Sequence, residues 1–220
     1  MKKYISTFLV AVLCLAFSIS AGATNVTTNN QGLTEDNIKH VDIIFENKAH
    51  VIDVDGTNIT SKFIEENKAR YQAGSYNEIL DCLIDQNLAI EEQPPVSPLE
   101  TRLVVNGSVK SSSITRYFKS PLTGTTTKEW ITFYFIGHYR VNDYNNTIDS
   151  GVKIEGVTTA KSSSTLNKIC FIDTSASSWK ITNNNKKITF TVKYSARIYT
   201  SPFTIADQQN GTTTFSKTLS

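Results

Sequence analysis

The stretch KITFTVKYSARIY, from Lys187 to Tyr199, alternates between apolar and polar side chains along its length. Successive side chains of a β-strand point to opposite faces of the sheet, so one set lies in the core and the other in solvent. The apolar set comprises Ile188, Phe190, Val192, Tyr194, Ala196 and Ile198, and the polar set comprises Lys187, Thr189, Thr191, Lys193, Ser195 and Arg197. We therefore expect a long, half-buried antiparallel strand here.

Further strands flank this one. Ser178 to Thr182 is expected to pair with it, because Asn183 to Lys186 has the length and composition of a hairpin turn. Shorter candidates are expected at 102–109, 114–118, 152–157, 169–172 and 213–219. Since no helical crossovers separate these strands, the predicted fold class is mainly β, with an antiparallel β-sandwich (immunoglobulin-like or similar) over 101–220 and a short helical segment before it.

A second long strand, from Trp130 to Val141, carries the candidate binding residues. Ile131, Phe133 and Phe135 are expected to face the core, which leaves Trp130, Tyr134 and Arg140 on the opposite face. Flat aromatic side chains beside polar groups suit contact with a protein or a glycan. Alternatively, the helical segment covers this face, because its own apolar stripe needs a partner.

Residues 38–92 are predicted to hold a strand, a turn and a short helical part. Gly74 is expected to end a first helix in a left-handed conformation, and Ser75 with Glu78 matches the capping box that begins a second. The second helix has an apolar stripe made of Tyr76, Ile79, Leu80, Leu83, Ile84 and Leu88. The proline-rich segment at 93–100 is expected to be a stiff linker.

The first 23 residues have the three parts of a secretory signal: Lys2 and Lys3, an apolar run, and small residues ending at Ala23. We expect cleavage there, release outside the cell and no membrane insertion afterwards. The polar segment 24–37 is predicted to be a disordered leader.

Loss of Lys2 and Lys3 on cleavage leaves 20 basic side chains against 20 acidic ones, so the remaining chain is neutral by formal count. This balance argues against a nucleic-acid partner, because affinity for nucleic acids comes largely from lysine and arginine. No cofactor or metal is expected, and the oligomeric state is not determined by these patterns.

Cys82 and Cys170 remain after cleavage. Export would place them in an oxidising compartment, where they can form a disulfide or stay as two thiols. Cys82 is expected to face away from the apolar stripe of its helix, which favours a bridge to another segment.

The motif DVDGT at Asp53 to Thr57 resembles the opening motif of haloacid-dehalogenase-like phosphatases, in which the first aspartate is the nucleophile. That resemblance implies a parallel sheet with crossover helices, and neither these nor the later acidic motif follow. Calcium-loop spacing also fails, because Gly56 is fourth and Ile64 twelfth counted from Asp53. We therefore interpret the motif as a turn.

No catalytic residues are predicted. A small secreted hydrolase with a site around His50, Asp53 and Asp55 is the alternative function, although no nucleophile elbow or zinc-binding helix motif is present. The signal, the segment DGTNITSKFI at Asp55 to Ile64 and the Ser/Thr-rich β region resemble small uncharacterised secreted proteins of Gram-positive, Firmicutes-type bacteria. The function expected is a non-enzymatic interaction module for a protein or glycan at or outside the cell surface.

Overall fold

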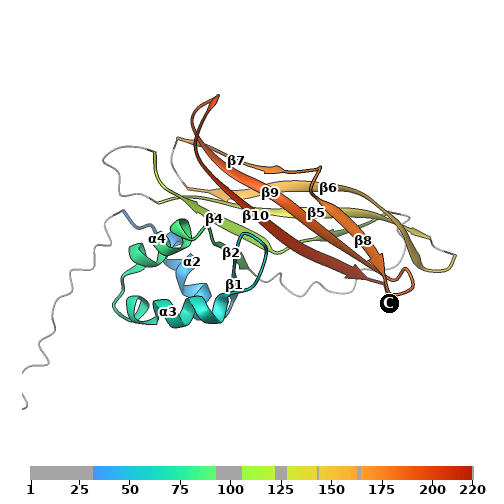
Figure 1. The fold of residues 1–220 in the computed structure, drawn as a ribbon, viewed down its shortest axis with the longest axis horizontal. Helices are drawn as coiled ribbons and strands as arrows, with labels where there is room; N and C mark the ends of the chain where they lie inside the picture. The colour runs from blue at the N-terminus through green and yellow to red at the C-terminus, as the bar shows by residue number, and fades with distance from the viewer. Residues whose placement is uncertain (1–31, 93–105, 122–127, 143, 163–164, 220) are drawn as a thin grey trace, which may run out of the picture.

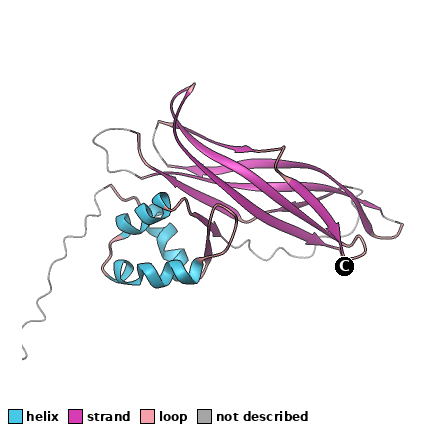
Figure 2. Ribbon diagram, viewed as in Figure 1, coloured by secondary structure: helices cyan, strands magenta, loops and turns pink. Residues whose placement is uncertain are grey.

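The computed structural model describes residues 32–92, 106–121, 128–142, 144–162 and 165–219. The predicted signal at 1–23, the predicted linker at 93–100 and most of the predicted leader lie outside these ranges. The chain forms two antiparallel sheets and a group of helices at one end of them (Figure 1; Figure 2). The predicted fold class, mainly β with antiparallel sheets and a helical segment before them, is confirmed.

The two sheets contain consecutive parts of the chain. The first comprises β1 (Ala49–Ile52), β2 (Ala89–Glu92), β3 (Asn106–Lys110), β4 (Ser113–Phe118), β5 (Glu129–Asn142) and β6 (Thr147–Lys161), in the order β1-β2-β4-β5-β3, with β6 also paired to β5. The second comprises β7 (Asn167–Ile172), β8 (Ser178–Thr182), β9 (Lys187–Ser201) and β10 (Thr204–Thr218), in the order β10-β9-β7, with β8 also paired to β9.

Strand β9 confirms the alternation read from its sequence. Each member of its apolar set is buried, whereas its polar set is exposed or half-buried. The β8–β9 hairpin also forms as expected, and its turn places Asn183, Asn184 and Asn185 at positive φ. Asparagine tolerates this left-handed region better than most side chains, which explains the run of three.

The two sheets share a hydrophobic core. Phe133 and Phe135 of β5 meet Val192, Tyr194 and Ala196 of β9 in one buried cluster. This packing removes the inner faces of both sheets from water, which is the dominant favourable contribution to folding. The finer class, an antiparallel β-sandwich of immunoglobulin-like or similar type, stays a prediction.

Three helices cover the other face of the first sheet at one end: α2 (Glu35–Phe45), α3 (Thr60–Gln72) and α4 (Tyr76–Asp85) (Figure 2). The stripe of α4 is buried as predicted, and Gly74 ends α3 at φ +69°. Ser75 is the N-cap of α4 but makes no side-chain capping bond, so the expected capping box is absent there. Residues 35–37, assigned to the leader, instead begin α2 behind the N-cap Thr34.

The helical part is not a separate appendage, because β1 and β2 belong to the main sheet. Strand β2 was missed at the sequence level, and it pairs with β1 on one side and β4 on the other. Helices and both sheets therefore form three layers at this end of the molecule (Figure 1). Within the described ranges, no helix is long and apolar enough to cross a membrane.

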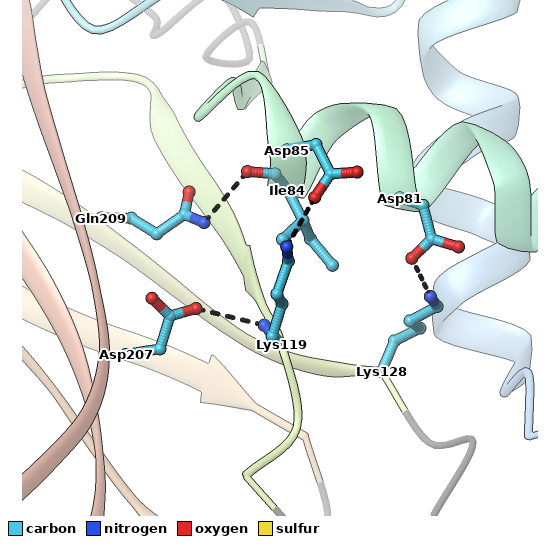
Figure 3. A network of polar contacts seen from close by, with 7 residues as sticks. All are labelled: Asp81, Ile84, Asp85, Lys119, Lys128, Asp207 and Gln209. Carbon is cyan, nitrogen blue, oxygen red and sulfur yellow. Dashed lines mark hydrogen bonds and ion pairs between the residues drawn. The ribbon is translucent and has the colours of Figure 1, made fainter.

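Polar contacts tie the C-terminal half of α4 to both sheets (Figure 3). Asp81 pairs with Lys128 next to β5, and Asp85 pairs with Lys119 next to β4 at 2.8 Å. From β10, Asp207 accepts a hydrogen bond from the Lys119 backbone N–H, and the Gln209 side chain donates to the Ile84 carbonyl. The position of α4 therefore depends on β10 as well as on the first sheet.

Candidate ligand-binding site

A pocket of about 510 Å³ lies over β7, β9 and β10 on the outer face of the second sheet. Its floor is built from neighbouring strands in register, since Ser195 lies opposite Phe171 on one side and Asn210 on the other. Directly opposed residues of antiparallel strands project from the same face, so these side chains form one continuous row. The next rows are led by Lys193, opposite Thr212, and Arg197, opposite Gln208.

A turn from the other end of the sequence forms one wall of this pocket. Val54 and Asp55 line it, and the turn packs so closely on β10 that a Cβ added at Gly56 would lie 2.8 Å from the Thr212 carbonyl oxygen. Gly56 also has φ +83°, a conformation that favours glycine. The DVDGT motif therefore contributes to a site through its backbone shape.

Asp53 explains how that shape is held. One carboxylate oxygen, Oδ1, accepts hydrogen bonds from the backbone N–H groups of Asp55 and Thr57, at 3.0 and 2.8 Å. A third hydrogen bond, between backbone groups, joins the Asp53 N–H to the Thr57 carbonyl. This arrangement is an Asx-type turn. Asp53 is thus a structural residue of the wall, which agrees with its interpretation as a turn residue.

The exposed aromatic ring of the pocket is Phe171, which is 41% exposed, whereas Tyr194 also lines the pocket but is buried. The guanidinium of Arg197 stacks on its ring at 4.9 Å from the ring centroid. The Arg197 Nε–H group donates to Ser195 Oγ at 3.3 Å. Both contacts restrict the position of the guanidinium over the floor of the pocket.

Charges of both signs surround this floor. Lys193 and Arg197 stand on the central strand β9, whereas Asp55 and Asp173 lie at the margins. Hydrogen bonds from the Ser175 hydroxyl and the Ala176 N–H lower the pKa of Asp173, so this carboxyl is ionised at neutral pH. The site therefore offers polar donors and acceptors with little net charge.

Trp130, Tyr134 and Arg140 do not form the binding surface that their shared face led us to expect. Trp130 is only 5% exposed, because the α2 residue His40 packs edge-on against its ring at 5.0 Å. The Tyr134 ring is occupied by Lys110 Nζ at 3.6 Å. Ten residues of extended strand separate Trp130 from the exposed Arg140, a span of about 33 Å. The alternative interpretation, in which the helical segment covers this face, is correct for Trp130.

The hydrolase alternative depends on His50, Asp53 and Asp55. These three residues have different surroundings. His50 lies opposite Glu91 in the β1–β2 pair, Asp53 is engaged in its turn, and Asp55 lines the pocket. In the part of the chain that the structure describes, no three His, Cys, Asp or Glu side chains lie close enough together to hold a metal ion.

The expected Cys82–Cys170 bridge is wrong, because both residues are free thiols. Cys82 packs against the cluster beneath the helices, whereas Cys170 packs into the cluster between the two sheets. The two side chains thus enter different cores on opposite faces of the first sheet. The expectation that Cys82 faces away from the packed side of its helix is also wrong.

Sequence reasoning missed the pocket, although part of its signal was present. The polar set of β9 correctly identified Lys193, Ser195 and Arg197 as outward-facing. Local alternation does not reveal that β10 and the turn at 53–57 complete the site.

The chain matches no protein-family model, no curated protein and no solved structure.

Proposed function

We propose that the protein is an exported, non-enzymatic module that binds a glycan in the pocket over β7, β9 and β10. The observation that carries this proposal is the composition of the pocket: an exposed aromatic ring, Phe171, lies across β9 from the side-chain amides of Gln208 and Asn210. Arg197 lies over one face of the Phe171 ring, so the apolar face of a sugar would pack on the part of the ring that stays exposed, while its hydroxyls need nearby donors and acceptors.

The size of the pocket favours a small ligand over a protein. Its volume, about 510 Å³, lies within the ~300–1,000 Å³ usual for small-molecule sites. A stable protein interface instead covers roughly 800 Å² on each partner. The three-strand floor and its single wall match one or two sugar residues better than such a surface.

The amides supply hydrogen-bonding groups of both kinds. Gln208 Nε2 donates to Asn210 Oδ1 at 2.9 Å, which fixes the two side chains relative to each other. This bond leaves the Asn210 amide N–H groups and the Gln208 side-chain carbonyl available to a ligand as donors and an acceptor. No nucleophile with an activating base accompanies them in the described part of the pocket, so binding without turnover is the function that this geometry favours.

A glycan array tests the proposal. The full chain is expected to bind a subset of glycans, and Phe171→Ala and Asn210→Ala should each weaken that binding by about tenfold or more. Thr214→Ala is the matched control, because Thr214 is exposed on β10 but does not line the pocket. Absence of glycan binding, or equal binding by all three variants and the parent chain, would contradict the proposal.

Export rests on the first 23 residues, whose charged, apolar and small-residue parts are typical of a secretory signal. Intact-mass analysis of protein released by an expressing cell is expected to show an N-terminus near Thr24. Released material that still begins at Met1 would refute cleavage.

A further inference from the structure

We infer that the bound sugar residue carries a carboxylate, which Arg197 binds end-on through its two terminal nitrogens. This inference rests on the proposed glycan function and names the ligand class of the same pocket. Arginine suits such a ligand because its planar guanidinium matches a carboxylate with two parallel N–H···O bonds.

The orientation of Arg197 is the first argument. Its guanidinium lies over the Phe171 ring and its Nε–H group donates to Ser195, so these two contacts restrict the position of the guanidinium. The terminal Nη1 and Nη2 groups have no hydrogen-bond acceptor among the described residues. A donor pair that is fixed in position but has no protein partner is prepared for an acceptor from outside.

The other described arginines show that this situation is particular to Arg197. Arg70 pairs with Glu78, and the buried Arg116 donates to the Tyr194 hydroxyl and to Asn87. Arg140 is exposed on β5, and no ring contact fixes it in place. Among these four residues, Arg197 alone is stacked in a pocket and lacks both a carboxylate and a carbonyl partner.

The surrounding charges support an acidic sugar over a free acid. Lys193 adds a second positive charge on the same strand, four residues from Arg197. Asp55 and Asp173 lie at the margins, where they can accept hydrogen bonds from hydroxyl groups but would repel further negative charge. A ligand with one carboxylate at its centre and hydroxyl groups at its edge would satisfy the two cations and the two carboxylates of the pocket.

The distribution of charge around the pocket also favours a ligand with a single terminal acid group over a polyanion. The chain that remains after residue 23 carries equal numbers of acidic and basic side chains. A repeating polyanion needs a row of cations along its length, whereas Arg197 and Lys193 cover only one sugar residue.

Titration calorimetry with paired probes tests the inference. Sialyllactose and a disaccharide ending in glucuronic acid supply the carboxylate from two sources, and lactose is the neutral counterpart of the first. The full chain is expected to bind at least one of the two acids about tenfold or more tightly than lactose. Added salt should weaken binding of the acid but not of lactose.

Variants of Arg197 separate charge from geometry. Arg197→Gln should remove the preference for the acid, and Arg197→Lys should restore only part of it, because lysine lacks the planar fork. Arg140→Gln is the matched control and should leave affinity unchanged. Equal affinity for acid and lactose that Arg197→Gln does not alter would overturn the inference while leaving the glycan proposal intact. Failure of the parent chain to bind any saccharide would overturn both.

Discussion

His40 is a buried ionisable residue at the contact between α2 and the first sheet. Its Nδ1 atom lies 2.8 Å from the Tyr117 hydroxyl, and its ring meets Trp130 edge-on. Burial lowers the pKa of His40 from 6.5 to about 4, against an opposing effect of Asp36 and with a smaller contribution from Lys39. The folded protein therefore favours the neutral imidazole.

This shift predicts that acid weakens the helix–sheet contact. Since the folded-state pKa lies below the unfolded value, stability from neutral His40 is fully present above pH 6.5 and is lost as pH falls towards about 4. Within that window the free energy of unfolding should fall by about 1.4 kcal/mol per pH unit from this residue. Urea unfolding at several pH values measures the effect.

Two variants isolate the contribution of His40. His40→Gln should remove this component of the pH dependence, whereas His138→Gln should not, because His138 is only half-buried and bonds to Glu155 near the surface. Identical pH profiles for the parent chain and His40→Gln would contradict this account of the contact.

Gly56 is the second position at which one residue determines local structure. Gly56→Ala should destabilise the fold by about 1–3 kcal/mol, because the residue has positive φ and its new methyl group would press on the Thr212 carbonyl. Gly156→Ala is the control, since a Cβ there has no neighbour nearer than 3.5 Å. Thermal unfolding of both variants measures the difference, and equal melting temperatures would refute the close contact between turn and β10.

Arg116 shows how neighbouring elements depend on one side chain. It extends from β4, is fully buried, and donates to the Asn87 carbonyl after α4 and to the Tyr194 hydroxyl of β9. A Cβ at Gly211 of β10 would collide with its guanidinium, so glycine makes room for it. One residue thus joins the end of α4 to both sheets.

The variant Arg116→Met tests this role. It should lower the free energy of unfolding by about 2–4 kcal/mol, because it leaves the buried Tyr194 hydroxyl and the part-buried Asn87 carbonyl without their partner. The exposed Arg140→Met should change it by less than about 0.5 kcal/mol. Chemical denaturation monitored by circular dichroism compares the two, and equal effects would show that the buried contacts contribute nothing.

Cys82 and Cys170 lie in different layers of the molecule, and their thiols should therefore differ in reactivity. Cys82 packs against the cluster beneath the helices, and Cys170 packs into the core between the two sheets. Burial raises the pKa of the Cys170 thiol to about 12, and thiols react as thiolates, so Cys170 should resist alkylation until the protein unfolds. Cys82 is half-buried on α4 and should react in the folded protein. Peptide mass spectrometry after alkylation without reductant measures both. A peptide joined through Cys82 and Cys170 would instead show that the bridge forms.

At the scale of helices and strands, the sequence predicts elements with a clear periodic pattern well and elements with a weak pattern poorly. Strand β9, its hairpin with β8 and the apolar stripe of α4 were all predicted, because period-two and helical patterns are clear in them. Strand β2 was not predicted, since its four residues are too few to show a period. Helix α2 was missed although Thr34, Glu35 and Asp36 form a recognisable helix start.

At the scale of the whole molecule, sequence patterns could not determine which face of the first sheet is covered. Both faces of β5 near Trp130 are buried, because helices pack on one and the second sheet on the other (Figure 1). Alternation alone assigns the polar face of a strand to solvent, and that inference holds for the outer face of β9, where the pocket lies. The candidate site thus follows from the order of layers, a property of long-range contacts.

Amide chemical-shift mapping of the isotope-labelled full chain with sialyllactose tests the central claim most directly. We predict shifts concentrated at residues 54–57, 171–173, 193–197 and 208–212, which line or flank the pocket. Residues around Trp130 and the helices should stay unchanged. Shifts confined to β5 or the helices, or none with any of the saccharide probes, would contradict the claim that this pocket is the binding site.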